Sequence, residues 1–249
     1  MPPIIKTEKL SHRFEDGTVA LNDISLSILQ NEFIVLCGAN GSGKTTLLKH
    51  LNGLMRPTAG AVRVAGERVD RNTLKARQTV GLVFQNADAQ IVGETVAVDT
   101  AFGPENLKLD RGLIAQRVAE TLRMTRLTHL AHRPPHTLSG GEKRRLAIAG
   151  VLAMRPKVLL LDEPFANLDW PATQRILAQL VTLHKKGGTL IIATHDIEKV
   201  IDHANRLIVL HKGAVALDGA PLTTARRVEP YGVRAPYTSA ECRCRPRGG

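Results

Sequence analysis

Cysteine is scarce in this sequence, and long apolar runs are missing from it. The three cysteines cannot build a disulfide framework, and Cys37 ends an apolar run, which is typical of a small core residue. No stretch approaches the roughly 20 apolar residues of a membrane-spanning helix, and the first residues contain no apolar core of a secretory signal. Hydrophobic residues still make up 43% of the 249 residues. We therefore expect a soluble cytosolic chain with one substantial core.

Acidic residues are outnumbered by basic ones, which gives a formal net charge of +11. A basic surface can attract nucleic acid or the anionic face of a membrane, and it can equally be a solvated face without a partner. Arginines are frequent near the end of the sequence, and residues 228–249 are expected to form a disordered basic tail. Cys242 and Cys244 lie in this tail, but two thiols fall short of the four ligands of a structural zinc site. The charge alone does not decide the function.

A glycine-rich loop at residues 38–45 carries the clearest chemical signal. It reads Gly-Ala-Asn-Gly-Ser-Gly-Lys-Thr, which fits the spacing of a phosphate-binding loop. An apolar run at 33–37 predicts a strand before it, and leucines at helical spacing predict a helix after it. Backbone N–H groups and the helix dipole would converge on phosphates, Lys44 would reach the β- and γ-phosphates, and the Thr45 hydroxyl would bind Mg²⁺. The residues expected to contact ATP here are Gly38, Asn40, Gly41, Ser42, Gly43, Lys44, Thr45 and Thr46.

Polar side chains end three further apolar runs. The run at 158–161 delivers Asp162 as a ligand of Mg²⁺ and Glu163 as a general base that faces the attacking water. His195 follows the run at 190–194, where it is placed to contact the γ-phosphate, although a lone histidine is more often a structural residue. Gln85 closes the run at 80–84, where an amide can bind Mg²⁺ or water and act as a hinge to the next segment.

A second glycine-rich segment, Leu138–Glu142, reads Leu-Ser-Gly-Gly-Glu. Gly140 and Gly141 open a predicted helix with an apolar face, so the helix dipole offers positive potential to a phosphate. Together with the first loop, this segment predicts a nucleotide sandwich. One chain holds the ATP phosphates with the first loop, and a second chain closes over them with Ser139 and the two glycine amides.

The order of the predicted elements indicates the fold class. Short strands around a turn at Asp16-Gly17 come first, the pattern from about residue 86 to about residue 155 is helical, and strand-helix alternation follows it. We expect an α/β protein with a P-loop core, a mainly parallel sheet, an N-terminal antiparallel β subdomain and an inserted helical subdomain. The predicted strands lie within 4–30, 61–64, 80–84, 158–161, 190–193 and 207–210, and the predicted helices outside the helical block lie at 172–183 and 197–204.

These motifs, in this order, resemble those of the ATPase subunits of ATP-binding cassette (ABC) transporters over residues 4–220. The resemblance implies the ABC ATPase fold, with ATP and Mg²⁺ as ligands, and makes Leu138–Glu142 the signature of the family. It identifies Gln85 and His195 with the two γ-phosphate sensors of the family, and Phe14 with the aromatic residue that stacks on adenine. The residues that it places against the ATP of a partner chain are Ser139, Gly140, Gly141, Glu142 and Asp169.

Two segments, 85–90 and 99–106, resemble those of energy-coupling factor ATPases, which power the uptake of vitamins and of cobalt or nickel ions. Ala87 and Ala89 depart from the residues usual in that group. The resemblance implies a peripheral motor at the cytoplasmic face of the cell membrane, not itself membrane-spanning. Its expected partners are integral membrane transport subunits and a second ATPase chain, identical or related, with no nucleic acid. The expected cargo is a cobalt or nickel ion, or next a vitamin.

Two other interpretations compete with transport. A cassette ATPase acting on DNA or ribosomes is mildly favoured by the net charge, but residues 45–138 contain no long heptad segment and the sequence has a single cassette. A P-loop kinase or GTPase leaves Leu138–Glu142 unexplained, because such an enzyme has no use for a second glycine-rich loop that acts on another chain. The transport interpretation accounts for all the motifs.

Overall fold

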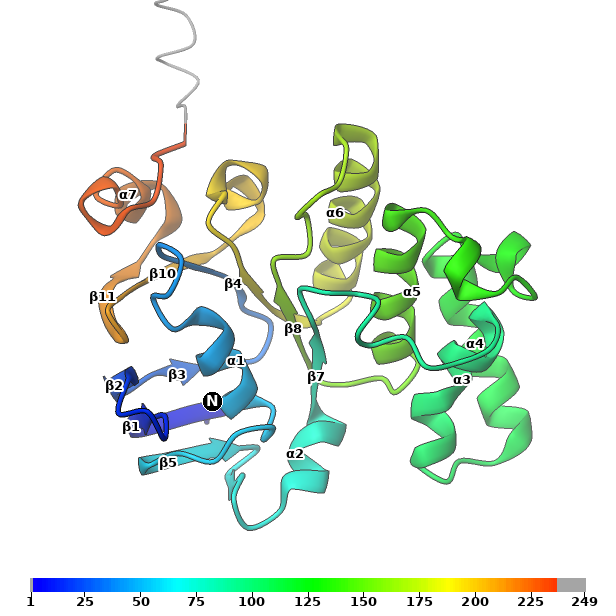
Figure 1. Cartoon of the computed structure of the whole chain (residues 1–249), viewed down its shortest axis with the longest axis horizontal. Helices are drawn as coiled ribbons and strands as arrows, with labels where there is room; N and C mark the ends of the chain where they lie inside the picture. Colours follow the sequence, from blue (N-terminus) through cyan, green and yellow to red (C-terminus); the bar gives the residue numbers. More distant parts are fainter. Residues whose placement is uncertain (1, 237–249) are drawn as a thin grey trace, which may run out of the picture.

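Two sheets organise the chain in the computed structural model, which describes residues 2–236 (Figure 1). The first sheet lies at the N-terminal end of the chain, and its neighbouring strands pair antiparallel. The expected N-terminal antiparallel sheet is therefore confirmed. Its strands are β1 (Ile5–Arg13), β2 (Val19–Ile24), β3 (Ser27–Ile28), β5 (Ala59–Val64) and β6 (Glu67–Arg68).

The second sheet has the strand order β11-β10-β4-β9-β8-β7 within the described residues. All its pairs are parallel except β10 with β11. Every residue of β4, β8 and β9 is buried, because helices or the first sheet cover both faces of the central strands. The strands are β4 (Phe33–Cys37), β7 (Val80–Val83), β8 (Val158–Asp162), β9 (Thr189–Ala193), β10 (Arg206–His211) and β11 (Ala214–Gly219).

Helices α1 (Lys44–Leu51) and α6 (Trp170–Lys185) pack on opposite faces of the second sheet. The leucines of α1 share one core cluster with Ile34 and Leu36 of β4. Phe33 and Val35 alternate with them along the strand and belong to the cluster of α6, as the two-residue period of a strand requires. Helix α1 consequently lies between the two sheets (Figure 1). The remaining short helices of this part are α2 (Thr73–Thr79) and α7 (Pro221–Ala225).

The helical block predicted at about 86–155 stands at one side of the second sheet (Figure 1). It follows β7, precedes β8 and contains α3 (Val96–Asn106), α4 (Arg111–Met124) and α5 (Gly140–Leu152), with the single 3₁₀ turns η1 (Thr128–Leu130) and η2 (Pro135–Thr137). The block has a core of its own, because leucines of α4, α5 and the turns pack together with Val96. It can therefore act as a unit that is attached to the sheet through two connections.

One helix predicted in the last third of the chain, within the described residues, is absent from the structure. The helix expected at 197–204 is replaced by two 3₁₀ turns, η3 (Ile197–Lys199) and η4 (Ile201–His203). Val200 between them has φ −130° and ψ −15°, because burying three β-branched side chains against the sheet prevails over helical periodicity. The sequence reading also missed β11 and α7.

The boundary of the predicted disordered tail is too early. Val228 and Val233 are buried against the second sheet, on either side of the 3₁₀ turn η5 (Glu229–Tyr231). Residues 237–249, with Cys242 and Cys244, lie outside the described residues. Across residues 2–236, no helix combines the length and the apolar character that a bilayer crossing requires.

Candidate functional site

The phosphate-binding loop connects the end of β4 to the start of α1, where the sequence predicts it. Gly38 and Gly43 have φ of 150° and 104°, in the region that favours glycine. A Cβ atom on Gly38 would collide with the carbonyl oxygen of Leu210, and one on Gly43 would lie 2.7 Å from the carbonyl oxygen of Ala20. The close approach of neighbouring backbone therefore requires these two glycines. The backbone N–H groups of the loop lie next to the N-terminus of α1, and N–H groups at a helix N-terminus generally bind anions.

Lys44 is buried in this loop, with its ammonium group donating to the carbonyl oxygens of Gly38 at 2.8 Å and Ala39 at 3.1 Å. Burial lowers the pKa of Lys44, and the nearby carboxylates of Glu163 and Asp162 partly oppose that shift. Ser42 Oγ is buried and has no hydrogen-bond partner within residues 2–236. A phosphate oxygen would satisfy both the ammonium group and this hydroxyl.

Asp162 ends β8 beside the start of α1. Its Oδ2 accepts a hydrogen bond of 2.7 Å from the Thr45 hydroxyl, while its Oδ1 is buried without a partner among the described residues. Burial raises the pKa of Asp162, and the Thr45 hydrogen bond counteracts this effect. An orphaned carboxylate oxygen next to a hydroxyl fits Mg²⁺, which prefers hard oxygen ligands. Thr45 and Asp162, both predicted as Mg²⁺ ligands, are thus brought together.

Gln85, the third predicted ligand of Mg²⁺, is exposed just after β7. It lines a hollow of about 370 Å³ together with Gly140, Arg144 and Asn167. The buried guanidinium of Arg144 donates to the carbonyl oxygens of Phe84 at 2.7 Å and Gln85 at 2.6 Å. The structure therefore ties the backbone at Gln85 to α5. Sequence reasoning missed Arg144, although its position two residues after the signature was visible.

Glu163 is held from several directions. Its Oε1 accepts from the backbone N–H of His195 at 3.0 Å and from His195 Nδ1 at 2.8 Å, and its Oε2 accepts from the Thr194 hydroxyl at 3.1 Å. The φ of Glu163 is 45°, a left-handed conformation that a non-glycine residue keeps only when its surroundings enforce it. These contacts put the hydrogen of a neutral His195 ring on Nδ1, an assignment from the network. Nε2 of His195 is then the nitrogen left to face a ligand.

Ser139 caps the N-terminus of α5. Its Oγ accepts from the backbone N–H of Glu142, and the Glu142 carboxylate accepts from both the backbone N–H and the hydroxyl of Ser139 at 2.8 Å. This capping box lowers the pKa of Glu142. The Glu142 carboxylate, predicted to contact ATP of a partner chain, is thus already used at the helix end. The Gly140 position is open, since a Cβ atom there would meet nothing within 4 Å.

A cavity of about 530 Å³ opens in front of this helix end. Asp169 lines it and caps α6 by accepting from the backbone N–H of Ala172 at 2.8 Å. Arg126, Arg145 and Arg175 line the same cavity, which the motifs did not predict. Arg145 is buried, and its Nε has no partner within the described chain. Burial lowers the pKa of Arg145, the Glu142 carboxylate partly opposes this shift, and the charges of Arg175 and Arg126 add to it. Three arginines thus face two acids, Glu142 and Asp169, in this cavity, and both acids already accept hydrogen bonds at helix ends.

The two halves of the predicted nucleotide site are separate on one chain. The phosphate loop, Asp162, Glu163 and His195 gather where β4, β8 and β9 end. The cavity of about 530 Å³ in front of α5, which we call the signature cavity, is lined by residues of the helical block, of the segment before α6 and of the first turns of α6, and by none of the phosphate loop. Phe14 lies in the loop between β1 and β2, with 41% of its surface exposed.

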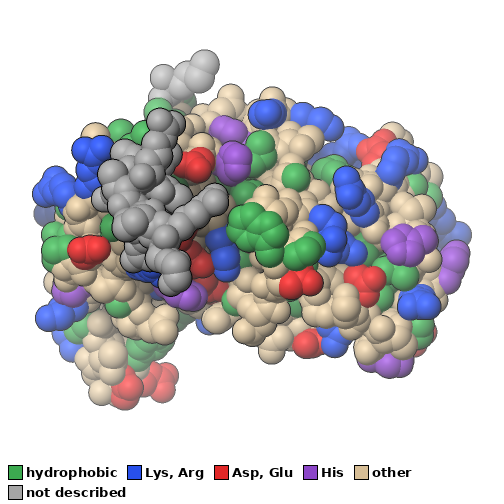
Figure 2. Space-filling view, turned by 90° about the horizontal axis from the view of Figure 1, so that it is seen from above, with side chains coloured by type: hydrophobic (Ala, Val, Ile, Leu, Met, Phe, Trp, Pro, Cys, Tyr) green, Lys and Arg blue, Asp and Glu red, His purple; other side chains and the backbone are tan. Residues whose placement is uncertain are grey.

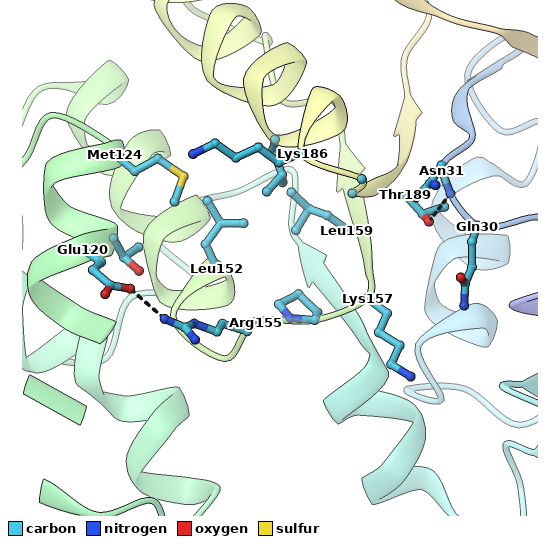
Figure 3. Close-up of a pocket in the computed structure, with 15 residues that line it drawn as sticks. Gln30, Asn31, Glu120, Met124, Leu152, Arg155, Lys157, Leu159, Lys186 and Thr189 are labelled. Atoms are coloured by element: carbon cyan, nitrogen blue, oxygen red, sulfur yellow. Dashed lines mark hydrogen bonds and ion pairs between the residues drawn. The ribbon is translucent and has the colours of Figure 1, made fainter. Parts of the chain in front are cut away.

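Another cavity, of about 490 Å³, lies between the helical block and the sheet (Figure 3). Arg155 on its wall forms an ion pair of 2.7 Å with Glu120 of α4. Lys157 and Thr189 on its wall stand where β8 and β9 begin, whereas the predicted catalytic residues stand where these strands end. None of the predicted site residues lines this cavity, so we assign it no part in the nucleotide chemistry.

Comparisons with known proteins agree with the motifs. The chain matches the family model described as ABC transporter over residues 21–166. It is 44% identical over 229 residues to the energy-coupling factor transporter ATP-binding protein EcfA of Methanocaldococcus jannaschii, covering 91% of this chain and 82% of that protein. It is 46% identical over 233 residues to a putative ABC transporter ATP-binding protein of Halobacterium salinarum, covering 94% and 100%.

Solved structures extend the likeness to the fold. CbiO1 of Clostridium perfringens, described as part of the ABC transporter complex cbiONQ, has a TM-score of 0.82 and 39% identity, covering 92% of this chain and 96% of that one. The ATP-binding cassette MJ0796, in a dimeric post-hydrolysis state with ADP and Pi, has a TM-score of 0.79 and 30% identity, covering 87% and 98%. These values bear out the fold class expected from the sequence.

Proposed function

The chain belongs to the ABC transporter family as one of its ATPases, and from this premise we propose that it is the ATP-hydrolysing motor of an energy-coupling factor importer. One observation carries the proposal. The chain has a phosphate loop with its carboxylates and a signature cavity, and the two lie apart on the same molecule. Each is half of a nucleotide site, so two chains arranged head to tail would complete two sites between them.

In the proposed mechanism, the loop amides, Lys44 and the N-terminus of α1 bind the phosphates of ATP. Thr45 and Asp162 would hold Mg²⁺, which neutralises charge on the β- and γ-phosphates when it is bound. The Glu163 carboxylate accepts a proton from the attacking water while the water oxygen attacks the γ-phosphorus. Thr194 and His195 keep that carboxylate in place through their hydrogen bonds. The bond to the β-phosphate oxygen breaks, and ADP and phosphate are the products.

The partner chain closes the site with Ser139 and the amides of Gly140 and Gly141. Arg126 and Arg175 around the cavity add positive potential toward the same phosphates. Hydrolysis removes the γ-phosphate that bridges the two halves, and the chains separate. This cycle turns the binding and hydrolysis of ATP into a closing and opening motion of the dimer.

We propose that a membrane subunit receives this motion at an apolar groove on the helical block. The groove, of about 250 Å³, is lined by Val92, Phe102 and Met154, among others. Val92 and Phe102 are 62% and 52% exposed, which is unusual for large apolar side chains and marks an interaction surface. Asp99 accepts from the backbone N–H groups of Val92 and Gly93 at 2.8 and 2.9 Å, so the rim of the groove is held in a defined shape.

The likeness to CbiO1 and to EcfA proteins supports a transporter of the energy-coupling factor type. From the resemblance of segments 85–90 and 99–106 alone, we propose a cobalt or nickel ion as the cargo, with a vitamin next, and the cytoplasmic face of the membrane as the location. On the face of the molecule drawn in Figure 2, acidic side chains are scattered among the basic ones, so this face does not favour the nucleic-acid alternative. We therefore keep the transport function as the proposal.

Co-purification from the native host tests the proposal. We expect the tagged chain, extracted in mild detergent, to bring an integral membrane protein with it. Phe102→Arg should lose that protein and keep ATP binding, while Leu222→Arg, a matched change of a 66% exposed leucine on α7, should keep both. Retention of the membrane protein by Phe102→Arg would refute the groove as its docking site. Recovery of ribosomes or DNA without a membrane protein would refute the transport function.

A further inference from the structure

Two histidines connect the loop of Phe14 to the helix that follows the phosphate loop. The ring of His12 meets the ring of Phe14 edge to face, with centroids 4.8 Å apart and an interplanar angle of 83°. On its other side His12 meets His50 of α1, with centroids 4.7 Å apart. His50 Nδ1 in turn lies 2.7 Å from the carbonyl oxygen of Thr46. Phe14 and Thr46 belong to the predicted ATP site, whereas the two histidines between them do not.

Hydrogen bonding fixes the orientation of both rings. The carbonyl oxygen of Thr46 can only accept, so His50 Nδ1 carries the hydrogen and the Nε2 of neutral His50 is an acceptor. His12 Nδ1, 3.2 Å away, must therefore be the donor. Burial, the largest effect, lowers the pKa of His50, and His12 acts in the same direction, which favours the neutral ring. These tautomers are assigned from the network.

A rotation of the His12 ring by half a turn would break this arrangement, because a carbon would replace Nδ1 opposite His50. His12 Nε2 is buried and has no partner within residues 2–236, so it does not hold the ring in place. The orientation of His12 therefore comes from His50, which is fully buried on a rigid helix. The orientation in which the His12 ring meets the Phe14 ring is therefore set by α1.

Phe14 needs such a support. Its backbone is fixed in the turn, because its N–H donates to the carbonyl oxygen of Thr18 at 2.9 Å and its carbonyl oxygen accepts from Gly17 at 3.0 Å. Its side chain, however, is 41% exposed, and backbone hydrogen bonds do not select a rotamer. A ring that must present its face to a base is pre-organised when a second ring packs against it.

We propose that His12 is a positioning residue for the nucleotide base. It holds the ring of Phe14 in the orientation that stacks on adenine, and His50 holds His12 by a hydrogen bond. This inference rests on the proposed ATPase function and on the adenine-stacking role that the family resemblance implies for Phe14. Thr46, the last residue in this series of contacts, belongs to the segment predicted to bind the phosphates. The contacts therefore fix the position of the Phe14 ring relative to the phosphate loop. Affinity for the base then depends on His12, although His12 itself need not touch the nucleotide.

Equilibrium binding to the full chain tests this proposal with two probes, ATP and inorganic tripolyphosphate, each with Mg²⁺. Tripolyphosphate has no base and reports on the phosphate loop alone. His12→Ala should weaken ATP binding between about twofold and tenfold, the range expected for an edge-to-face aromatic contact, and should leave tripolyphosphate binding unchanged. In the Phe14→Ala background, His12→Ala should weaken ATP binding no further, because the ring that it positions is gone.

His12→Asn is the control for folding. Asparagine can keep an amide donor toward His50 while it removes the ring that touches Phe14, so it should weaken ATP binding as alanine does. Full ATP affinity in His12→Asn would overturn the positioning role, as would equal loss of ATP and tripolyphosphate, which indicates general damage to the site. Unchanged ATP affinity in Phe14→Ala is a distinguishable failure, since it overturns the stacking role on which the inference rests.

Discussion

Replacing the Glu163 carboxylate by an amide should separate ATP binding from ATP hydrolysis. Glu163→Gln keeps the size of the side chain and an oxygen that can accept from both His195 donors. The other oxygen, Oε2, is replaced by an NH₂ group that donates, and the Thr194 hydroxyl can rotate to accept that hydrogen bond. The geometry is therefore preserved, while the group that takes the proton from water is lost. Removing a general base typically costs about 10²- to 10⁴-fold in rate, and we expect a fall in kcat of that size.

The binding side of the site should survive this change. Lys44, Thr45 and Asp162 keep their contacts with each other and with the loop, so the dissociation constant for Mg²⁺-ATP should stay within a few-fold. With hydrolysis blocked, ATP should hold two chains together. Size-exclusion chromatography with Mg²⁺-ATP is then expected to show a stable dimer of Glu163→Gln and only a transient one of the unmodified chain.

A matched carboxylate provides the control. Glu120→Gln removes an exposed acid whose ion pair with Arg155 lies far from the phosphate loop, and exposed pairs of this kind contribute little. We expect its single-turnover hydrolysis rate to equal that of the unmodified chain. Normal hydrolysis by Glu163→Gln, measured in the same single-turnover assay, would refute the assignment of Glu163 as the base.

Three further predictions test other parts of the site. Asp162→Asn should raise the melting temperature at neutral pH and abolish hydrolysis. Burial raises the pKa of Asp162 above its ordinary value of 3.8 in the folded chain. Ionisation therefore destabilises the folded chain as pH rises through this raised pKa, and the difference in melting temperature between Asp162→Asn and the unmodified chain should vanish near pH 4 or below. Arg144→Lys should lower the free energy of unfolding in urea by about 1–3 kcal/mol, because an ammonium group cannot satisfy both carbonyl groups at the end of β7. Trp170 is the single tryptophan and is 66% exposed beside Asp169. In the proposed dimer it should become buried between the two chains, so its emission should shift to the blue when Mg²⁺-ATP is added to Glu163→Gln. Unchanged emission would contradict this burial.

The sequence was sufficient to predict the positions of those site residues that follow a local pattern. Asp162 and His195 follow apolar runs of strand length, and parallel strands end at one edge of a sheet, so their meeting near the phosphate loop could be predicted. The Arg144 contacts could not. They join residues about 60 positions apart, and their formation depends on how the helical block docks against β7. The His12–His50 contact spans 38 positions and requires the first sheet to pack on α1.

The Arg144 contacts, which the sequence did not predict, connect two motifs: the signature at the start of α5 and the segment at Gln85. Arg144 lies on the helix that begins with the signature, and it binds the backbone of Gln85 at the entrance to the helical block. In the proposed role of Gln85 as a γ-phosphate sensor, a shift of Gln85 would pull directly on the N-terminal part of α5, which Ser139 caps. Because α5 also packs in the core of the helical block, the block cannot move independently of Gln85 without breaking buried hydrogen bonds. In the proposed dimer, the state of the phosphate on one chain would thereby be linked, through Arg144, to the position of the surface that meets the nucleotide of the other chain.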